Sequence, residues 1–235
     1  MEQIILNFRN ELKNNTDEKT QNSTQRFFKE KILTYGVKSQ IMKKLIGDYY
    51  KIIENESKNR IFEICTQLWQ SGYFEEELTA CNWAYNLHKQ FEPKDFSIFE
   101  NWVSNYVDNW ASCDTLCNHT IGTFIDMFPQ YIENLKIWAK SNNRWMKRAS
   151  AVTLIIPARN GRYLNHIFQI ADILLLDKDD MVQKGYGWML KAASETHQKE
   201  VFDYVVKNKT TMPRTALRYA IEKMPKEMKA IAMKK

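Results

Sequence analysis

The chain has 235 residues, of which 44% are hydrophobic and 26% charged, enough for one large domain or a single elongated array. No stretch approaches the roughly 18 consecutive apolar residues of a membrane span, and the amino terminus lacks the hydrophobic block of a signal peptide, so we expect a cytoplasmic protein. The net charge of +6 is uneven: residues 140–235 hold 19 Lys and Arg against 9 Asp and Glu, and residues 1–139 hold 15 against 19. The basic part indicates a polyanionic partner, with nucleic acid first and an anionic membrane second, although a solvated lysine-rich surface is the plainer alternative.

The sequence predicts a nearly all-α protein. It contains only 7 Gly and 5 Pro, and its apolar residues mostly recur at spacings of three and four. The predicted helices lie near residues 2–13, 20–35, 38–53, 58–71, 74–90, 94–107, 112–128, 129–140, 142–156, 161–176, 179–195, 197–208 and 212–224. The breaks coincide with Gly36, Gly72, Pro93, Pro129 and Gly161, and a further proline, at 213, marks a helix start.

Three segments resemble one another, at residues 145–152, 182–189 and 212–219. Arg148, Lys184 and Arg214 occupy matching places in them, 36 and 30 residues apart. A helical pattern repeated at that interval is typical of antiparallel helix pairs stacked into an α-solenoid, whose concave side provides a binding surface. No linker divides the chain, so we expect one domain over residues 1–235.

The segment 181–193 shows most clearly which residues face the core. Val182, Tyr186, Met189 and Ala193 follow helical spacing and form an expected core stripe. On roughly the opposite side lie three further residues with the same spacing, Lys184, Trp188 and Lys191. A tryptophan between two lysines fits a binding surface, and packing against a neighbouring repeat fits it equally well.

Trp110 and Asp114 lie four residues apart, ahead of the apolar positions 117, 121, 124 and 128. If the helix begins early enough, Asp114 lies on the same stripe and loses part of its hydration, so that it requires a partner. The competing interpretation makes Ser112 or Asp114 the N-cap of a helix that begins later. Trp110 alone would more often belong to the core.

Arg144 and Arg148 share one flank of the predicted helix 142–156, beside its core stripe. An arginine there is suited to bidentate contact with a phosphate, and a surface salt bridge is the ordinary alternative. Cys113, Cys117 and His119 suggest zinc, but no fourth ligand at a recognisable spacing accompanies them. We therefore expect no metal and no cofactor, and four reduced, mostly buried thiols.

These residues, in this order, resemble the DNA alkylation repair family of HEAT-like DNA glycosylases, the AlkD type. The resemblance covers most of the chain and is most specific in the Trp-x-x-x-Asp element and the Gly-Trp helix. It runs through residues 109–114, 144–149 and 184–191, and more weakly through 26–29 and 35–37.

The resemblance implies a right-handed α-solenoid whose basic concave face holds duplex DNA, and excision of positively charged N3- and N7-alkylated purines. By match to the family's pattern, Asp114 would be the catalytic carboxylate, and Trp110 and Trp188 would form an aromatic cleft around the sugar and backbone of the lesion nucleotide. Arg148 would hold phosphate, and Phe27 falls where the family has a further aromatic. The family is thought to act without enclosing the base in a pocket.

The chain departs from the family pattern at three positions. Members often have an aromatic residue before the first tryptophan and an acidic residue after it, where this chain has Asn109 and Ala111. Phe27 lacks the hydroxyl of the expected tyrosine. Relatives with altered clefts bind DNA without detectable excision.

The chemistry needs few groups, because an alkylated purine is already cationic and leaves without protonation. One carboxylate suffices to stabilise an oxocarbenium-like sugar and to position water. No lysine is singled out for a strand-nicking lyase step, so we expect a monofunctional hydrolase.

Three functions remain open from the sequence. The first is an alkylpurine DNA glycosylase that acts as a monomer on duplex DNA containing alkylated bases, in the cytoplasm and on the nucleoid when bound. The second is a non-catalytic protein that binds damaged or branched DNA. The third is a protein-interaction scaffold. Besides Arg148 and Phe27, the residues expected to contact DNA are Arg144, Lys184, Lys191 and Arg214.

Overall fold

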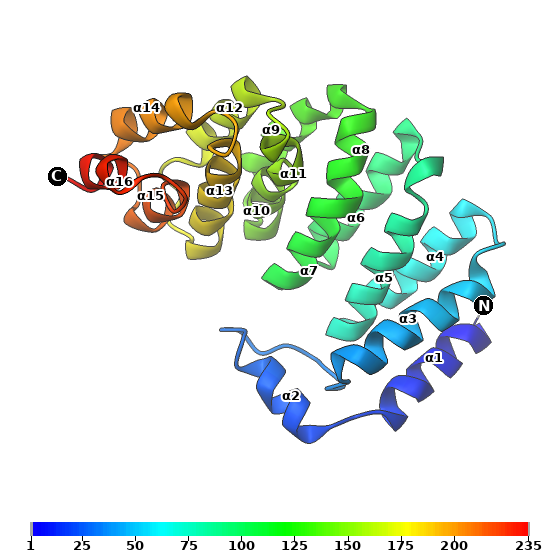
Figure 1. Cartoon of the computed structure of the whole chain (residues 1–235). Helices are drawn as coiled ribbons and strands as arrows, with labels where there is room; N and C mark the ends of the chain where they lie inside the picture. Colours follow the sequence, from blue (N-terminus) through cyan, green and yellow to red (C-terminus); the bar gives the residue numbers. More distant parts are fainter. Residues whose placement is uncertain (1, 235) are drawn as a thin grey trace. The chain divides into compact units, whose positions relative to one another are not determined.

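The computed structural model describes residues 2–234, and the regular elements of that range are all helices (Figure 1). The prediction of an all-helical protein is therefore confirmed. The chain packs into two compact units, one running from the amino terminus to Thr115 and the other from Leu116 to the carboxy terminus. The expectation of a single domain stays a prediction.

Unit 1 is built from helices that pack in overlapping pairs. Helix α4 packs against α5, α5 against α3 and α7, and α6 against α4, as expected for stacked helix pairs (Figure 1). Two short 3₁₀ turns, η1 (His88–Gln90) and η2 (Pro93–Asp95), connect α5 to α6. The helices of the unit are α1 (Glu2–Asn14), α2 (Glu18–Gln25), α3 (Ser39–Ile53), α4 (Lys58–Trp69), α5 (Phe74–Asn86), α6 (Phe96–Asn105) and α7 (Trp110–Thr115).

Unit 2 repeats this mode of packing around α13, which contacts α10, α11, α12 and α15. Its elements are the π-helix η3 (Leu116–Ile121), α8 (Gly122–Met127), η4 (Pro129–Tyr131), α9 (Ile132–Ala139), α10 (Arg144–Val152), α11 (Ile155–Arg159), α12 (Leu164–Leu174), α13 (Asp180–Ala193), α14 (Gln198–Asn208), α15 (Arg214–Ala220) and α16 (Lys226–Met233). The three segments that resemble one another in sequence fall on α10, α13 and α15, and α13 packs against both of the others.

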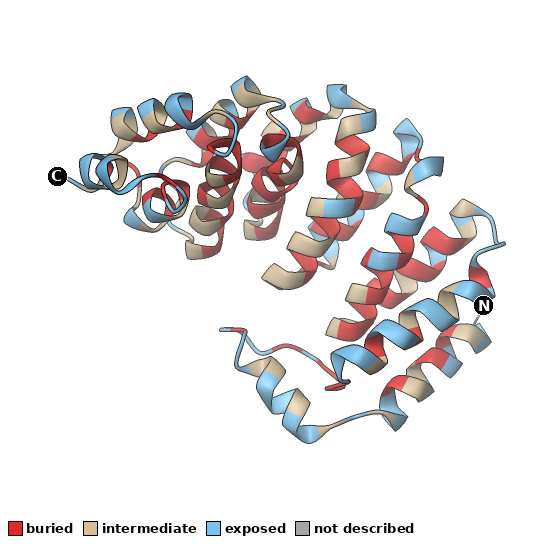
Figure 2. Cartoon of the chain, viewed as in Figure 1, coloured by how far each residue is buried: buried red, intermediate tan, exposed pale blue. Residues whose placement is uncertain are grey.

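Both units bury hydrophobic side chains between their helices. Buried residues lie along the sides of the helices that face their neighbours, whereas the outer sides are exposed (Figure 2). In α13, Val182, Tyr186, Met189 and Ala193 are all fully buried. The core stripe predicted for this helix is confirmed.

The helix predicted over residues 20–35 is half wrong, because α2 ends at Gln25. The next twelve residues form an irregular segment, and several of its backbone groups bond to side chains. The Gln25 side chain bonds the carbonyl of Glu30 and the N–H of Ile32. Gly36 has a φ of 76°, and a Cβ there would lie 2.8 Å from the carbonyl oxygen of Asp17. The segment needs glycine at this position.

The helix predicted over residues 142–156 is two helices. Helix α10 ends at Val152, and α11 begins at Ile155, so that Pro157 lies in the first turn of α11. A proline is tolerated there because its missing N–H has no partner within the helix, whereas in one continuous helix its ring would clash with the carbonyl four residues earlier. The sequence also failed to indicate α16. Lys209 and Arg214 donate to the carbonyls of Ile231 and Met233 at the end of that helix.

Two glycines allow α13 to approach its neighbours closely. A Cβ on Gly187 would lie 2.7 Å from the Cβ of Tyr219 and 2.8 Å from the carbonyl oxygen of Ala216, both on α15. A Cβ on Gly185 would lie 3.2 Å from the Cγ of Arg148 on α10, where the neighbour is a flexible side chain. Position 187 therefore has no room for a larger residue, whereas position 185 can admit a methyl group if the Arg148 side chain shifts.

We expect Gly187→Ala to lower the free energy of unfolding by about 2 kcal/mol or more, because α15 must move away to admit the new methyl group. Gly185→Ala is the matched control and should change stability much less, because the Arg148 side chain can shift and alanine favours helix. Urea unfolding of the two variants measures the difference. Equal urea midpoints for the two variants would show that the close α13–α15 contact does not require glycine at position 187.

Candidate functional site

Helix α7 begins at Trp110, and Asn109 is its N-cap. The Oδ1 atom of Asn109 accepts hydrogen bonds from the backbone N–H groups of Ala111 (3.1 Å) and Ser112 (2.9 Å). Of the two interpretations drawn from the sequence, the early helix start is confirmed, and the N-cap role of Ser112 or Asp114 is wrong. The N-cap preference of asparagine could have identified this start.

Asp114 lies inside α7, one turn after Trp110, and both residues are partly exposed. A helical separation of four residues puts the carboxylate and the indole on the same side of the helix. The chain changes from α- to π-helical hydrogen bonding at Leu116, directly after this six-residue helix. Segments of π-helix are frequent at functional sites.

The aromatic partner of Trp110 within unit 1 is Phe28. The two rings stack with centroids 5.5 Å apart and an interplanar angle of 30°, and Phe28 also meets Phe74 edge-on at 5.4 Å. Phe27, the residue expected to contact DNA, is 73% exposed on the same irregular segment. The structure therefore gives Phe28 a packing role beside Trp110 and leaves Phe27 available to a partner.

Three consecutive glutamates in the first turn of α5 are buried, at 4%, 0% and 0% exposure for Glu75, Glu76 and Glu77. Nothing in their sequence pattern indicates this burial, because glutamates are rarely buried without partners. Each accepts hydrogen bonds from other parts of unit 1. Their position at a helix N-terminus is favourable for negative charge.

Glu75 and Glu76 fasten the irregular segment and α1 to α5. Glu75 accepts hydrogen bonds from the backbone N–H groups of residues 35–37 at 2.8–3.2 Å and from the Thr34 hydroxyl at 2.8 Å. Glu76 accepts from Arg9 at 2.9–3.1 Å and from the Tyr35 hydroxyl at 2.8 Å. The hydrogen bond to Glu76 and the negative charge of that residue raise the pKa of the Arg9 guanidinium, although partial burial lowers it.

Glu77 is fastened to the start of α7. Its Oε2 accepts from the Asn109 Nδ2 at 2.8 Å, and the same Nδ2 donates to Asp108 at 2.9 Å. Burial, and then the charge of Asp108, raise the pKa of Glu77 to about 7, while hydrogen bonding from Asn109 and Ser112 opposes the rise. Glu77 therefore titrates near neutral pH.

The shifted pKa of Glu77 predicts a pH-dependent stability. A carboxyl whose pKa rises on folding from 4.5 to about 7 contributes stability that is complete below pH 4.5 and is lost as the pH rises through 7. Glu77→Gln keeps the shape and removes the titration. Relative to the natural protein, we expect the variant's free energy of unfolding to increase by up to about 3 kcal/mol between pH 4.5 and pH 8. Urea unfolding of both proteins across this range provides the measurement, and a difference independent of pH would contradict it.

In unit 2, Arg148 is buried, with 5% of its surface exposed, and its Nη1 donates to the carbonyl oxygen of Met181 at the start of α13. Its side chain packs against Gly185. Arg148 is therefore not a surface side chain. Its position links α10 to α13, and direct contact with phosphate stays a prediction.

The opposite side of α13 carries Lys184, Trp188 and Lys191, all partly exposed as the spacing indicated. Lys184 forms an ion pair with Asp180 at 2.7 Å, and Lys191 pairs with Glu222 at 2.9 Å. Trp188 is thus flanked by two lysines that are already paired in the free protein. Ion pairs with exposed partners contribute little stability, so a phosphate can replace the carboxylates at small cost.

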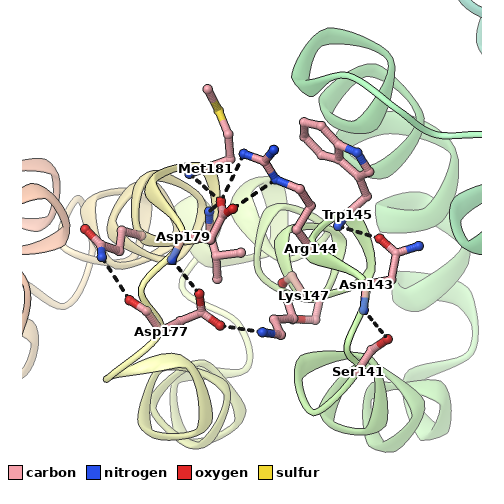
Figure 3. A network of polar contacts seen from close by, with 11 residues as sticks. Ser141, Asn143, Arg144, Trp145, Lys147, Asp177, Asp179 and Met181 are labelled. Atoms are coloured by element: carbon pink, nitrogen blue, oxygen red, sulfur yellow. Dashed lines mark hydrogen bonds and ion pairs between the residues drawn. The ribbon is translucent and has the colours of Figure 1, made fainter. Parts of the chain in front are cut away.

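A network at the start of α13 holds the cations of α10 (Figure 3). Arg144 pairs with Asp179 at 3.0 Å, and Lys147 pairs with Asp177 at 2.7 Å. Asp179 also caps α13 by accepting from the backbone N–H of Met181 at 2.8 Å. Arg214, the third of the matching basic residues, is exposed on α15 and donates to the Met233 carbonyl. Arg148, Lys184 and Arg214 thus match in sequence but differ in burial.

The four cysteines are buried thiols. Within residues 2–234 there is no group of three or more His, Cys, Asp or Glu side chains that could hold a metal ion. In the same range, none of the helices combines the length and the apolar character needed to cross a membrane.

Comparison with solved structures defines the class of fold. A protein from Enterococcus faecalis described as a predicted DNA alkylation repair enzyme shares the fold with a TM-score of 0.80 and 15% sequence identity, over 90% of this chain and 97% of that one. The predicted α-solenoid class is confirmed. The sequence profile of the family described as DNA alkylation repair enzyme matches residues 8–224, so the chain belongs to that family. No curated protein sequence matches the chain. Family membership supports a role in the repair of alkylated DNA, and with it DNA binding.

Proposed function

We propose that the protein is a monofunctional DNA glycosylase that hydrolyses the N-glycosidic bond of N3- and N7-alkylated purines in duplex DNA. The observation that carries the proposal is the pairing of Asp114 with Trp110, one turn apart and partly exposed on α7. Membership of the DNA alkylation repair enzyme family supports alkylated DNA as the substrate. No cofactor is required by this chemistry.

Asp114 supplies the negative charge that the reaction needs. An alkylated purine carries a positive charge and departs as a neutral base, which leaves an electron-poor, oxocarbenium-like sugar. A nearby carboxylate stabilises that sugar and orients the attacking water, and no general acid is needed for the leaving group. Trp110 supplies an aromatic face that attracts cationic and electron-poor groups.

Unit 2 contributes contacts with the DNA strand in this proposal. Trp188 presents an indole between Lys184 and Lys191, and Arg144 lies on the neighbouring helix α10. The carboxylates that now pair with these cations are partly exposed, at 39% for Asp180 and 53% for Glu222, and phosphates can displace them. Contacts of this kind track the backbone and give little sequence preference.

The test is release of N7-methylguanine and N3-methyladenine from methylated duplex DNA, measured by mass spectrometry. Release of free base with an intact abasic strand supports a monofunctional glycosylase, and strand nicking would argue for a lyase. A parallel arm compares a bulky N7 adduct. Similar release of both adducts supports action without a pocket, and failure on all bulky adducts would contradict it.

The alternative function is non-catalytic binding of damaged or branched DNA. The departures at Asn109 and Ala111 from the family pattern favour it, because altered clefts accompany binding without excision in relatives. Tight, salt-sensitive binding without base release would establish the alternative, since phosphate neutralisation releases counterions. Absence of any DNA affinity would leave the third function, a protein-interaction scaffold.

A further inference from the structure

Three hydrogen bonds through the Asn109 side chain connect the start of α7 to α5. Glu77 on α5 accepts from the Asn109 Nδ2 at 2.8 Å, and the Asn109 Oδ1 accepts from the N–H groups of Ala111 and Ser112. The two ends of the Asn109 side-chain amide thus have different partners. The nitrogen donates to Glu77 on α5, and the oxygen caps α7. Asn109 is 4% exposed and Glu77 is fully buried, so water cannot replace either partner.

A second contact between the same two helices lies one turn further along α5. The Cys81 thiol meets the carbonyl oxygen of Ser112 at 3.9 Å, and Cys81 is four residues after Glu77. Glu77 and Cys81 therefore hold the first turn of α7 at two points. The first residue of that turn is Trp110, and the next turn contains Asp114.

Asp114 lies in the turn that directly follows this capped first turn, and π-helical hydrogen bonding begins at Leu116. The direction of a side chain in the second turn of a helix depends on how the first turn is capped and packed. The cap of α7 depends on Asn109, and the orientation of the Asn109 amide depends on its acceptors, Glu77 and Asp108.

We propose that Glu77 is a positioning residue for Asp114, acting through the Asn109 cap on the start of α7. The proposal rests on the proposed function. It also accounts for the departure at Asn109, since a bulky aromatic residue there could not cap α7 with a side-chain oxygen as Asn109 does. Glu77 does not contact the DNA in this scheme, and its effect is on the rate of the chemical step.

The experiment compares Glu77→Leu with Glu77→Gln. Leucine removes the acceptor for the Asn109 amide, whereas glutamine offers a carbonyl oxygen at nearly the same place. With methylated duplex DNA, we expect Glu77→Leu to lower kcat by about 10- to 100-fold with little change in KM, and Glu77→Gln to restore most of it. Thr79→Val is the control for general loosening of α5, because its buried hydroxyl donates within the helix to the Glu75 carbonyl.

Amide hydrogen exchange at Ala111 and Ser112 gives a second measurement that does not depend on catalysis. Exchange at these two positions should be faster in Glu77→Leu than in Glu77→Gln or Thr79→Val. If the leucine variant does not fold, Asn109→Ser keeps a capping oxygen and removes the donor to Glu77, and it should show the same loss of kcat. An unchanged kcat in a folded Glu77→Leu or Asn109→Ser protein overturns the positioning role. No excision by the natural protein would instead reject the proposed function, and the exchange rates would still decide whether the link exists.

Discussion

Asp114→Asn is expected to lower the rate of N7-methylguanine release by at least about 100-fold while leaving the affinity for duplex DNA unchanged or slightly increased. Asparagine has the shape of the carboxylate but cannot offset the positive charge that develops on the sugar. It also removes a negative charge that repels phosphate. Single-turnover release and equilibrium binding measured on the same methylated duplex separate the two effects.

The matched control for Asp114 is another aspartate of unit 1. Asp48 lies on α3, its side chain is 51% exposed, and it forms a long ion pair with Lys51 at 3.8 Å. Asp48→Asn changes the net charge by the same amount and should leave both base release and binding at the level of the natural protein. If Asp114→Asn and Asp48→Asn release base equally fast, Asp114 is not the catalytic carboxylate. A loss of binding in Asp114→Asn would point to a structural role instead.

The elements that the sequence predicted well are those whose burial follows from helical periodicity. In α13 the four-residue spacing identified Val182 and Tyr186 as core, and both are fully buried. Apolar side chains must be removed from water wherever they occur, so their spacing alone reports the buried side of a helix. The family and the fold followed from the same helices and from the order of Trp110, Asp114 and Trp188.

The errors arose where tertiary contacts decide the local structure. Residues 26–35 were predicted as helix, but the backbone N–H groups of residues 35–37 bond to the distant Glu75. No local pattern reports a partner about forty residues away. The interruption before α11 was different, because Pro157 signals it directly.

The same distinction between local pattern and tertiary contact applies to the candidate site. The residues that we expect to meet DNA or the lesion can be proposed from their types and order, whereas the residues that hold them in place cannot. Glu77 could not be recognised because a glutamate near a helix N-terminus is usually exposed. Asn109 was noticed as a departure from the family, and only its contacts with Ser112 and Glu77 explain it.

Glu75→Gln should destabilise unit 1 by about 3 kcal/mol or more, the largest stability effect that we expect from a single isosteric change. Glu75 accepts from three backbone N–H groups and one hydroxyl, and a carboxylate can serve all four because it carries acceptors on both oxygens. Glutamine has one oxygen, and its amide nitrogen would face either the N–H of Tyr35 or the donors of Gly36 and Val37. At least one buried donor then loses its partner.

The neighbouring variant Glu77→Gln is the control for this prediction, because the same chemical change is made two residues away on the same helix. Glu77 has a raised pKa, so its replacement should stabilise the protein at pH 8, opposite in sign to Glu75→Gln. Urea unfolding at pH 8 compares the two, and amide exchange at residues 35–37 should accelerate only in Glu75→Gln. The same sign of effect in both variants would mean that charge at the start of α5, rather than the individual hydrogen bonds, governs stability there. Opposite signs would show that the two buried carboxylates of α5 act differently. Glu75 would then stabilise the segment that bears Phe27 and Phe28, whereas the ionised form of Glu77, beside α7, would lower the stability of the fold.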